Sequence, residues 1–277
     1  MTDYGTRHEP SETVVTTVLA DEEQPLSFLQ KVHQYMDNEL DPKHADALLL
    51  LSYVATGLVD SCAVRTWGSF VSMQTGNTVY IGLGLAALDQ PDQESNRRWI
   101  KSLSSLVCFG FGTFCFSRYH AKFHERRRWV LTLSFLVQLV CVLIAYGVVR
   151  GGAYYAQEME KRPPLHWQVI VPIALVSFQS SAQALVSRAL GFRSLTSVVL
   201  TSIYIDIFSD PDLFTLAWRG HAERNRRLFA PLLLLCGAFL GGQWAESDTG
   251  MAGALLSVVF LKAFITFMFI VWPKEKN

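Results

Sequence analysis

No charged residue interrupts the stretch Leu131-Thr-Leu-Ser-Phe-Leu-Val-Gln-Leu-Val-Cys-Val-Leu-Ile-Ala-Tyr-Gly-Val-Val149. Its length is close to the roughly 20 apolar residues that an α-helix needs to cross the hydrocarbon core of a bilayer. Seven other apolar stretches of similar length are separated from one another by charge-bearing loops. All eight stretches, in chain order, are Ala45–Val64, Trp67–Leu88, Trp99–Ser117, Trp129–Val149, Trp167–Ser187, Leu190–Phe208, Leu228–Ala245 and Met251–Trp272. The chain is therefore predicted to be an all-α, polytopic integral membrane protein.

The distribution of charge, rather than the apolar content, separates this chain from soluble proteins. Apolar residues make up 50% of the sequence, near the value of about 45 to 50% that is usual for soluble domains. Charged residues make up only 17%, against about 25% in soluble domains, and most lie in the N-terminal tail and the loops. Because the formal net charge is zero, nothing favours a nucleic-acid partner, and the predicted partner is the lipid bilayer.

The sequence divides into a polar tail, one membrane domain and a short C-terminal tail. Residues 1–44 are polar and lack the apolar core of a signal peptide, so they are predicted to form a cytosolic tail. Within this tail, Pro25–Leu40 spaces its apolar residues at helical intervals, which predicts a short amphipathic helix on the membrane surface or on the protein's own face. Residues 45–272 are predicted to form a single transmembrane helical domain, and residues 273–277 a C-terminal tail.

Short motifs recur in the same order in the two halves of the membrane domain. Arg65-Thr66-Trp67-Gly68 is matched by Arg188-Ala189-Leu190-Gly191, and Asn96-Arg97-Arg98 is matched by Asn225-Arg226-Arg227. The pattern predicts an internal repeat of four hydrophobic segments, with chance similarity between apolar segments as the alternative. The two predicted copies cover residues 45–150 and 166–272.

The predicted number of membrane crossings is six to eight. Within each repeat, the first two segments form either two full crossings or one crossing that is broken near its polar residues. Six crossings give the larger excess of basic residues on the side of the N-terminal tail, as the positive-inside rule favours, and would make the repeats inverted. Eight crossings put both Asn-Arg-Arg motifs on the cytosolic side and would make the repeats parallel. The sequence leaves both arrangements open.

Polar side chains gather where the first two segments of each repeat meet. A charged group at this depth costs roughly 2.5 to 3.5 kcal/mol on insertion scales, so it generally faces protein or water. In the first repeat these residues are Asp60, Arg65, Gln74, Thr75 and Asn77. In the second repeat they are Gln179, Gln183, Arg188 and Asp206. We predict that they line a solute-binding site where the repeats meet, with hydrogen bonding between neighbouring helices as the structural alternative.

Two local patterns support this prediction. In Gln74-Thr75-Gly76-Asn77-Thr78, Gly76 lowers helix stability by about 1 kcal/mol relative to alanine, and Asn77 tolerates a left-handed conformation. The helix is therefore predicted to open there, as apolar segments do at transporter binding sites. In the second half, Gln179, Gln183 and Ser187 follow one another at spacings of four and form one polar stripe on a helix.

These same motifs resemble the YoaK-like membrane proteins, domain of unknown function 1275, in their fungal form. The resemblance covers about Leu48 to Val271 and is carried by Met73-Gln74-Thr75-Gly76-Asn77 and by Gln183-Ala184-Leu185-Val186-Ser187-Arg188. It implies a polytopic membrane protein and brings no reaction or substrate with it. Members of the family often have Thr-Gly where this chain has Thr201-Ser202.

The sequence predicts a secondary transporter or facilitator of a small solute or metabolite. An integral-membrane enzyme acting on a lipophilic metabolite, with Asp60 or Asp206 as the acid, is the first alternative, and a membrane scaffold or assembly factor is the second. No hydrolase, metalloprotease or nucleotide-binding motif is present, so no catalytic residue, metal site or cofactor is predicted. The pattern does not distinguish the plasma membrane from an internal membrane, and it predicts no oligomeric state.

Overall fold

The protein is a bundle of α-helices throughout the residues that the structure, a computed structural model, describes: 27–87, 95–156, 165–192, 194–215, 218 and 220–275. The predicted all-α class is confirmed, and the part of the predicted tail before Ser27 lies outside the described residues. The helices are α1 (Phe28–Asp37), α2 (Asp46–Trp67), α3 (Gln74–Ala86), α4 (Ser95–Phe123), α5 (Arg128–Ala156), α6 (Trp167–Ala189), α7 (Thr201–Phe208), α8 (Ala222–Glu246) and α9 (Gly250–Val271).

Six helices in the described part of the chain are long and apolar enough to cross a membrane, namely α2, α4, α5, α6, α8 and α9. At a rise of 1.5 Å per residue, the 22 residues of α2 match the roughly 30 Å hydrocarbon core of a bilayer. The other two apolar stretches contain α3, with 13 residues, and α7, with 8 residues, and both helices are too short to cross. Helix length therefore selects six crossings from the two arrangements that the sequence left open.

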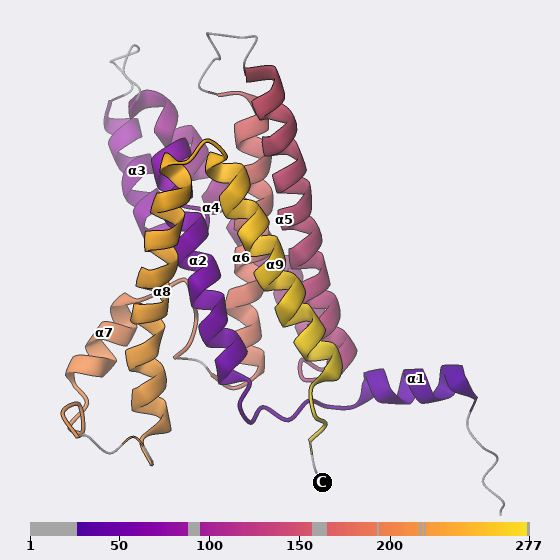
Figure 1. Cartoon of the computed structure of the whole chain (residues 1–277). Coiled ribbons are helices and arrows are strands. Elements are labelled where there is room, and N and C mark those ends of the chain that lie inside the picture. Colours follow the sequence, from indigo (N-terminus) through magenta and orange to yellow (C-terminus); the bar gives the residue numbers. More distant parts are fainter. Residues whose placement is uncertain are drawn as a thin grey trace, which may run out of the picture.

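One long helix, one short helix and two long helices follow each other twice along the chain, first from α2 to α5 and then from α6 to α9. Figure 1 shows that successive long helices run in opposite directions. Helices α2, α5 and α8 lead away from the end of the bundle that holds α1 and the C-terminus, and α4, α6 and α9 lead back. Because each half contains three long helices, α6 starts at the end of the bundle where α2 finishes.

The most extensive helix contact joins α2, the most buried of the long helices, to α8. Gly241 of α8 makes this approach possible, because a Cβ at this position would overlap the carbonyl oxygen of Leu58 and Oγ of Ser61 in α2. Small residues at such crossings let the helix backbones come close, which promotes association where lipid supplies no hydrophobic driving force.

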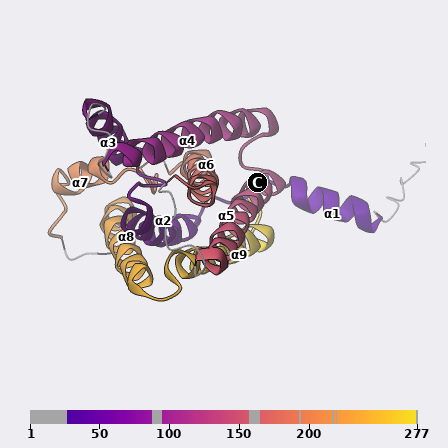
Figure 2. The same ribbon diagram turned by 90° about the horizontal axis from the view of Figure 1, so that it is seen from above.

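The next most extensive contact joins α4 to α6, which lie side by side in Figure 2. It is built in the same way, because a Cβ at Gly112 of α4 would overlap the carbonyl oxygen of Phe178 and Oγ of Ser181 in α6. Each half of the chain thus supplies one glycine-bearing helix that packs on the first long helix of the other half.

Arg128, at the start of α5, ties the two ends of the described chain together. Its side chain is 1% exposed and donates hydrogen bonds to the carbonyl oxygens of Tyr35, at 2.7 Å, and Trp272, at 2.6 Å. The guanidinium also stacks on the Tyr35 ring at 3.8 Å from its centre. An isolated antiparallel bridge between Leu40 and Lys274 joins the same two segments. The tail is thereby fixed at the base of the bundle.

Helix α1 projects sideways from this base, across the direction of the long helices (Figures 1 and 2). Its apolar side chains Phe28, Leu29, Val32 and Tyr35 are exposed. A helix with exposed apolar side chains at the level where the spanning helices end fits the interface between lipid headgroups and acyl chains.

We expect Gly241→Leu to destabilise the protein, because the new side chain has to push α2 and α8 apart. Overpacking of this kind costs typically about 1–3 kcal/mol, and each kcal/mol lowers the melting temperature by about 2–4 °C in a chain of this size class. Gly242→Leu is the matched control, since a Cβ at Gly242 meets no atom within 4 Å. The melting temperatures of the two variants are measured in detergent, with size-exclusion chromatography as the readout of folded protein. Equal melting temperatures would contradict the tight contact between α2 and α8.

Candidate functional site

Helix α2 ends at a glycine because the chain turns sharply there into the short helix α3. Gly68 has a φ of 78°, in the left-handed region, and its N–H donates to the carbonyl oxygens of Ala63 and Val64. The segment 68–73, which we call the first hinge, connects this turn to the start of α3 at Gln74. The first hinge lies at the end of the bundle away from the chain termini (Figure 1).

Asp60 of α2 holds the first hinge against the bundle. Its carboxylate is 2% exposed and accepts hydrogen bonds from the backbone N–H groups of Val71, at 2.8 Å, and Ser72, at 2.9 Å. It also accepts a hydrogen bond from the Ser72 hydroxyl. Buried backbone N–H groups need a partner, so Asp60 replaces the hydrogen bonds that the broken helix has lost. Asp60, which was predicted to line a solute-binding site, therefore positions the first hinge in the structure.

Asn77 of α3 holds the other side of the first hinge. Its Oδ1 accepts from the Phe70 N–H at 3.0 Å, and its Nδ2 donates to the Phe70 carbonyl oxygen at 2.8 Å. Nδ2 also lies within hydrogen-bond distance of Gln74 Oε1, at 2.9 Å, and Ser105 Oγ of α4, at 3.0 Å. The predicted opening of the helix at Gly76 and Asn77 is wrong, because α3 runs through both residues and the break lies upstream of them. Asn77 uses its amide to stabilise the start of α3, and Gly76 leaves room for the Phe70 ring.

Helix α6 ends in a similar way at the opposite end of the bundle. Gly191 has a φ of 84°, and its N–H donates to the Arg188 carbonyl oxygen at 3.0 Å. Residues 191–192 and 194–200, which we call the second hinge, lead to α7. Ser197 in this hinge is buried, and its Oγ accepts a hydrogen bond from Nε2 of Gln183 in α6 at 2.5 Å. Gln183 therefore holds the second hinge as Asp60 holds the first.

Gln183 also belongs to a polar centre inside the bundle, built around Lys262 of α9. The Lys262 ammonium donates to Oε1 of Gln183 and to Oε1 of Gln138 in α5, both at 2.5 Å. Gln183 Nε2 lies 2.8 Å from Thr56 Oγ1 and 3.2 Å from the Ser52 carbonyl oxygen, both in α2. Four long helices, two from each half, thus share one group of hydrogen bonds.

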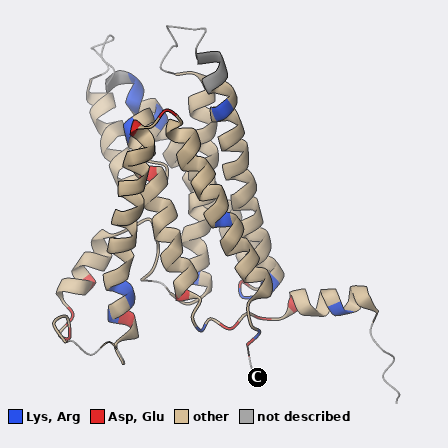
Figure 3. Ribbon diagram, viewed as in Figure 1, with Lys and Arg blue, Asp and Glu red and all other residues tan. Residues whose placement is uncertain are grey.

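Lys262 is 0% exposed and forms no ion pair with a described carboxylate. In Figure 3, most charged residues gather towards the two ends of the long helices, whereas a basic residue lies about halfway along α9. A cation placed there needs internal hydrogen-bond acceptors, and here both acceptors are amide oxygens.

A small interior cavity lies beside Lys262. Its volume is about 10 Å³, which is about the room that one water molecule needs. Its polar wall includes Thr56, Ser72, Gln179 and Gln183 together with Lys262, and all five side chains are buried. Because Ser72 belongs to the first hinge and Gln183 holds the second, the cavity touches both hinge systems.

The structure brings some of the other predicted site residues near this centre and leaves others outside it. Gln74 joins the Asn77 group through a hydrogen bond to Ser105 Oγ at 3.1 Å. Arg65 is exposed and pairs with Glu246 at the end of α8, a position where an ion pair contributes little to stability. Two further predicted residues are exposed and lie outside the polar centre, namely Thr75 and Arg188.

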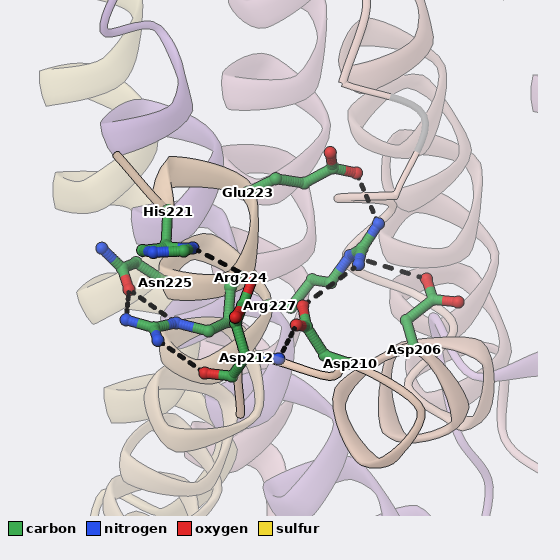
Figure 4. A network of polar contacts seen from close by, with 8 residues as sticks. All are labelled: Asp206, Asp210, Asp212, His221, Glu223, Arg224, Asn225 and Arg227. Carbon is green, nitrogen blue, oxygen red and sulfur yellow. Dashed lines mark hydrogen bonds and ion pairs between the residues drawn. The ribbon is translucent and has the colours of Figure 1, made fainter. Parts of the chain in front are cut away.

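Asp206 lies in a separate ionic network between α7 and α8 (Figure 4). Its carboxylate is 3.8 Å from Nε of Arg227, which also lies 3.9 Å from Asp210 and forms an ion pair with Glu223 at 2.5 Å. Asp206 and Asp210 come from α7 and its end, so Arg227 joins α7 to the base of α8, whereas Glu223 belongs to α8 itself. Asp206 and Asp60 therefore belong to different networks, which gives no geometric basis for an acid–base pair.

Comparison with known protein families identifies the family of the chain. A family model described as "Protein of unknown function (DUF1275)" matches residues 48–268. The chain belongs to the DUF1275 family. Comparison with curated proteins and with solved structures finds no match. The family name carries no reaction, so the function of this DUF1275 protein has to be argued from its site.

Sequence reasoning missed the two residues that define the polar centre of this DUF1275 protein, Lys262 and Gln138. Lys262 is the one charged residue in the 22 residues of α9, and its cost at membrane depth was the signal that could have identified it. Gln138 lies in the uncharged stretch Leu131–Val149, where a single amide is a weak signal for a functional site. Both residues lie in the last long helix of their half, away from the hinges where polar residues cluster in the sequence.

We expect Asn77→Ala to destabilise this DUF1275 protein by roughly 2 kcal/mol or more, because both backbone groups of Phe70 lose their buried partner. Thr78→Ala, at the exposed neighbouring position, is the control and should change the melting temperature little. Asn77→Asp keeps the Oδ1 acceptor but places a second acceptor against the Phe70 carbonyl oxygen, so it should destabilise the protein at least as much as Asn77→Ala. An Asn77→Ala protein as stable as the wild type would show that the hinge does not depend on this clamp.

Proposed function

We propose that this protein is a secondary transporter or facilitator that moves a small polar solute through the centre around Lys262. One observation carries the proposal: a fully buried lysine lies midway along the most apolar of the six long helices and contacts amides, with no described carboxylate as partner. Charged side chains inside a membrane are costly and generally mark solute pathways or proton relays. A purely structural contact between α5, α6 and α9 could be made by apolar or amide side chains alone.

The partners of Lys262 suit a site that binds and then releases a solute. A bound carboxylate would neutralise the ammonium permanently, whereas amide oxygens satisfy its hydrogen bonds and leave its charge available to a polar solute. Gln138 Nε2 and Gln179 Oε1 are also buried without a hydrogen bond to any described residue. One is a donor and the other an acceptor, so the centre offers a solute both kinds of hydrogen bond. Asp60, which accepts a hydrogen bond from Ser72 of the cavity wall, places a carboxyl group close to the centre.

We infer that the two halves are inverted repeats. The contact of Gly241 with Leu58 and Ser61 between α8 and α2 has its counterpart in the contact of Gly112 with Phe178 and Ser181 between α4 and α6. In both contacts the glycine meets a carbonyl oxygen and the hydroxyl of a serine three residues later. Because each half has three long helices, the second copy runs through the membrane in the opposite sense, as in many secondary transporters.

The hinges support the same inference. Gly68 and Gly191 both adopt positive φ where the first long helix of their half ends. Asp60 then binds Ser72, and Gln183 binds Ser197, so each helix holds its own hinge through one buried serine. The two hinges close the polar centre from opposite ends of the bundle, which is the arrangement that alternating access requires.

Gln183 links solute binding to the second hinge. Its side chain contacts Lys262, Thr56 and Ser197 at once. A solute acceptor that binds Lys262 competes with Oε1 of Gln183 for the ammonium, and a Gln183 side chain displaced in this way also moves its Nε2 away from Ser197. The solute then binds more tightly to one conformation of the second hinge than to the other. This difference in affinity supplies the free energy that shifts the equilibrium between the two conformations.

We expect Lys262→Met to abolish solute uptake while the protein remains folded, because methionine fills similar space and removes a buried charge. Proteoliposomes that contain the protein are incubated with a small-metabolite extract and washed, and the lumenal contents are identified by mass spectrometry. Uptake of the identified solute should fall at least tenfold in Lys262→Met. Phe264→Met is the matched control, since Phe264 lies on the same helix with an exposed side chain.

The outcomes separate the candidate functions. Equal uptake by the wild type and Lys262→Met would overturn the assignment of the centre. No uptake of any solute by the wild type would overturn transport, and a solute whose mass changes in detergent solution would instead indicate a membrane enzyme. A scaffold would tolerate Lys262→Met in cells that require the protein.

A further inference from the structure

A second cavity lies at the end of α2 over the first hinge, on the side of the bundle away from the chain termini. Its volume is about 420 Å³, within the range of roughly 300–1,000 Å³ that is usual for small-molecule sites. Its wall is formed by the end of α2, by α3 and by α4. The residues that define this cavity, which we call the basic vestibule, are Arg65, Trp67, Gly68, Tyr80, Arg98 and Lys101.

Arg98 is the best-positioned cation of the basic vestibule. Its guanidinium lies 3.5 Å from the centre of the Tyr80 ring, and its Nε donates a hydrogen bond to the Gly68 carbonyl oxygen. These two contacts fix the plane of the guanidinium. Its two terminal amino groups form no hydrogen bond with a described residue, so they are available as the two-pronged donor that binds carboxylate and phosphate oxygens.

Lys101 and Arg65 add positive charge to the same wall. Lys101 Nζ lies 3.0 Å from the Trp67 carbonyl oxygen, and Arg65 pairs with Glu246. The described wall residues include three cations and no acid. Basic side chains often bind the last carbonyl oxygens of a helix, and that role explains one hydrogen bond each for Arg98 and Lys101. It does not explain a cavity with several converging cations.

We propose that the basic vestibule binds an anionic oxygen group, a phosphate or a carboxylate. The group belongs either to a small metabolite or to a lipid headgroup, and the two sources share the same chemistry. Arg98 supplies paired hydrogen bonds, Lys101 supplies a point charge, and Tyr80 holds the guanidinium in place.

The position of the basic vestibule also makes it the outer access to the interior cavity. Trp67 and Gly68 line the vestibule, whereas Val71 and Ser72, a few residues further along the same hinge, line the cavity beside Lys262. The first hinge therefore lies between the cations of the basic vestibule and Lys262. This access role rests on the proposed transport function, whereas binding of an anion to the basic vestibule does not.

Binding is tested on the full-length protein, purified in neutral detergent and stripped of lipid, by thermal stabilisation. Inorganic phosphate, citrate and a short-chain phosphatidate are titrated separately at constant ionic strength. We expect a saturable rise in melting temperature with at least one of them. Arg98→Gln should weaken the apparent affinity roughly tenfold or more, as the loss of charge-assisted hydrogen bonds does. Arg98→Lys, which keeps the charge and loses the planar donor, should give an intermediate affinity.

Arg97→Gln is the matched control, since Arg97 is the exposed sequence neighbour of Arg98 and does not line the cavity. General salt effects on stability act on all variants equally, so the comparison isolates the site. Stabilisation by phosphate or citrate identifies a soluble anion, and stabilisation by the phosphatidate alone identifies a lipid headgroup. No stabilisation by any probe, or an equal response of Arg98→Gln and Arg97→Gln, would overturn the proposal.

The same assay separates this proposal from the proposed transport function. Lys262→Met should keep wild-type affinity in the stabilisation assay, because Lys262 does not line the basic vestibule. If Lys262→Met retains both binding and solute uptake, the transport centre is wrong and the anion site stands. If uptake depends on Lys262 but Arg98→Gln binds every probe as well as the wild type, the basic vestibule is wrong and the transport centre stands.

Discussion

Lipid offers no hydrogen bonds, and this constraint organises the interior of the bundle. A polar group that the chain places between its apolar helices is costly unless it finds a partner inside the protein. Lys262 donates hydrogen bonds to two glutamine oxygens from two other helices. Gln183, one of these glutamines, is also hydrogen-bonded to α2 and to the second hinge. Four long helices are thereby fixed in register by hydrogen bonds that apolar packing alone would not specify.

The same constraint explains the behaviour of the hinges. A helix that stops inside a membrane leaves backbone groups without partners, and the chain compensates with Asp60 and Asn77 at the first hinge. Both residues were predicted to bind a solute because they are polar at membrane depth. In the structure they bind backbone, so a polar residue beside a helix break is weaker support for a ligand site than a polar residue on an unbroken helix, such as Lys262.

The sequence was sufficient for the fold class and for the location of the hinges, since apolar length and the Arg-to-Gly motifs that end at Gly68 and Gly191 are local signals. It also identified Gln183 as part of a polar stripe. The sequence could not distinguish six crossings from eight. The lengths of α3 and α7 decide between them, and these lengths depend on where each hinge ends and its short helix begins. The sequence could not pair Lys262 with Gln138, because that contact joins helices 124 residues apart in sequence.

The contacts of Arg128 have a consequence for how the chain is made. This side chain binds a carbonyl oxygen of α1 and a carbonyl oxygen directly after α9, so its final environment exists only after α9 has packed in the bundle. Helix α1 can dock on the start of α5 before α9 is made, through the ion pair between Arg127 and Asp37, whereas the hydrogen bond to Trp272 forms later. The contact with Trp272 therefore closes the base of the bundle last, and a chain without α9 would leave this hydrogen bond of a buried guanidinium unmade.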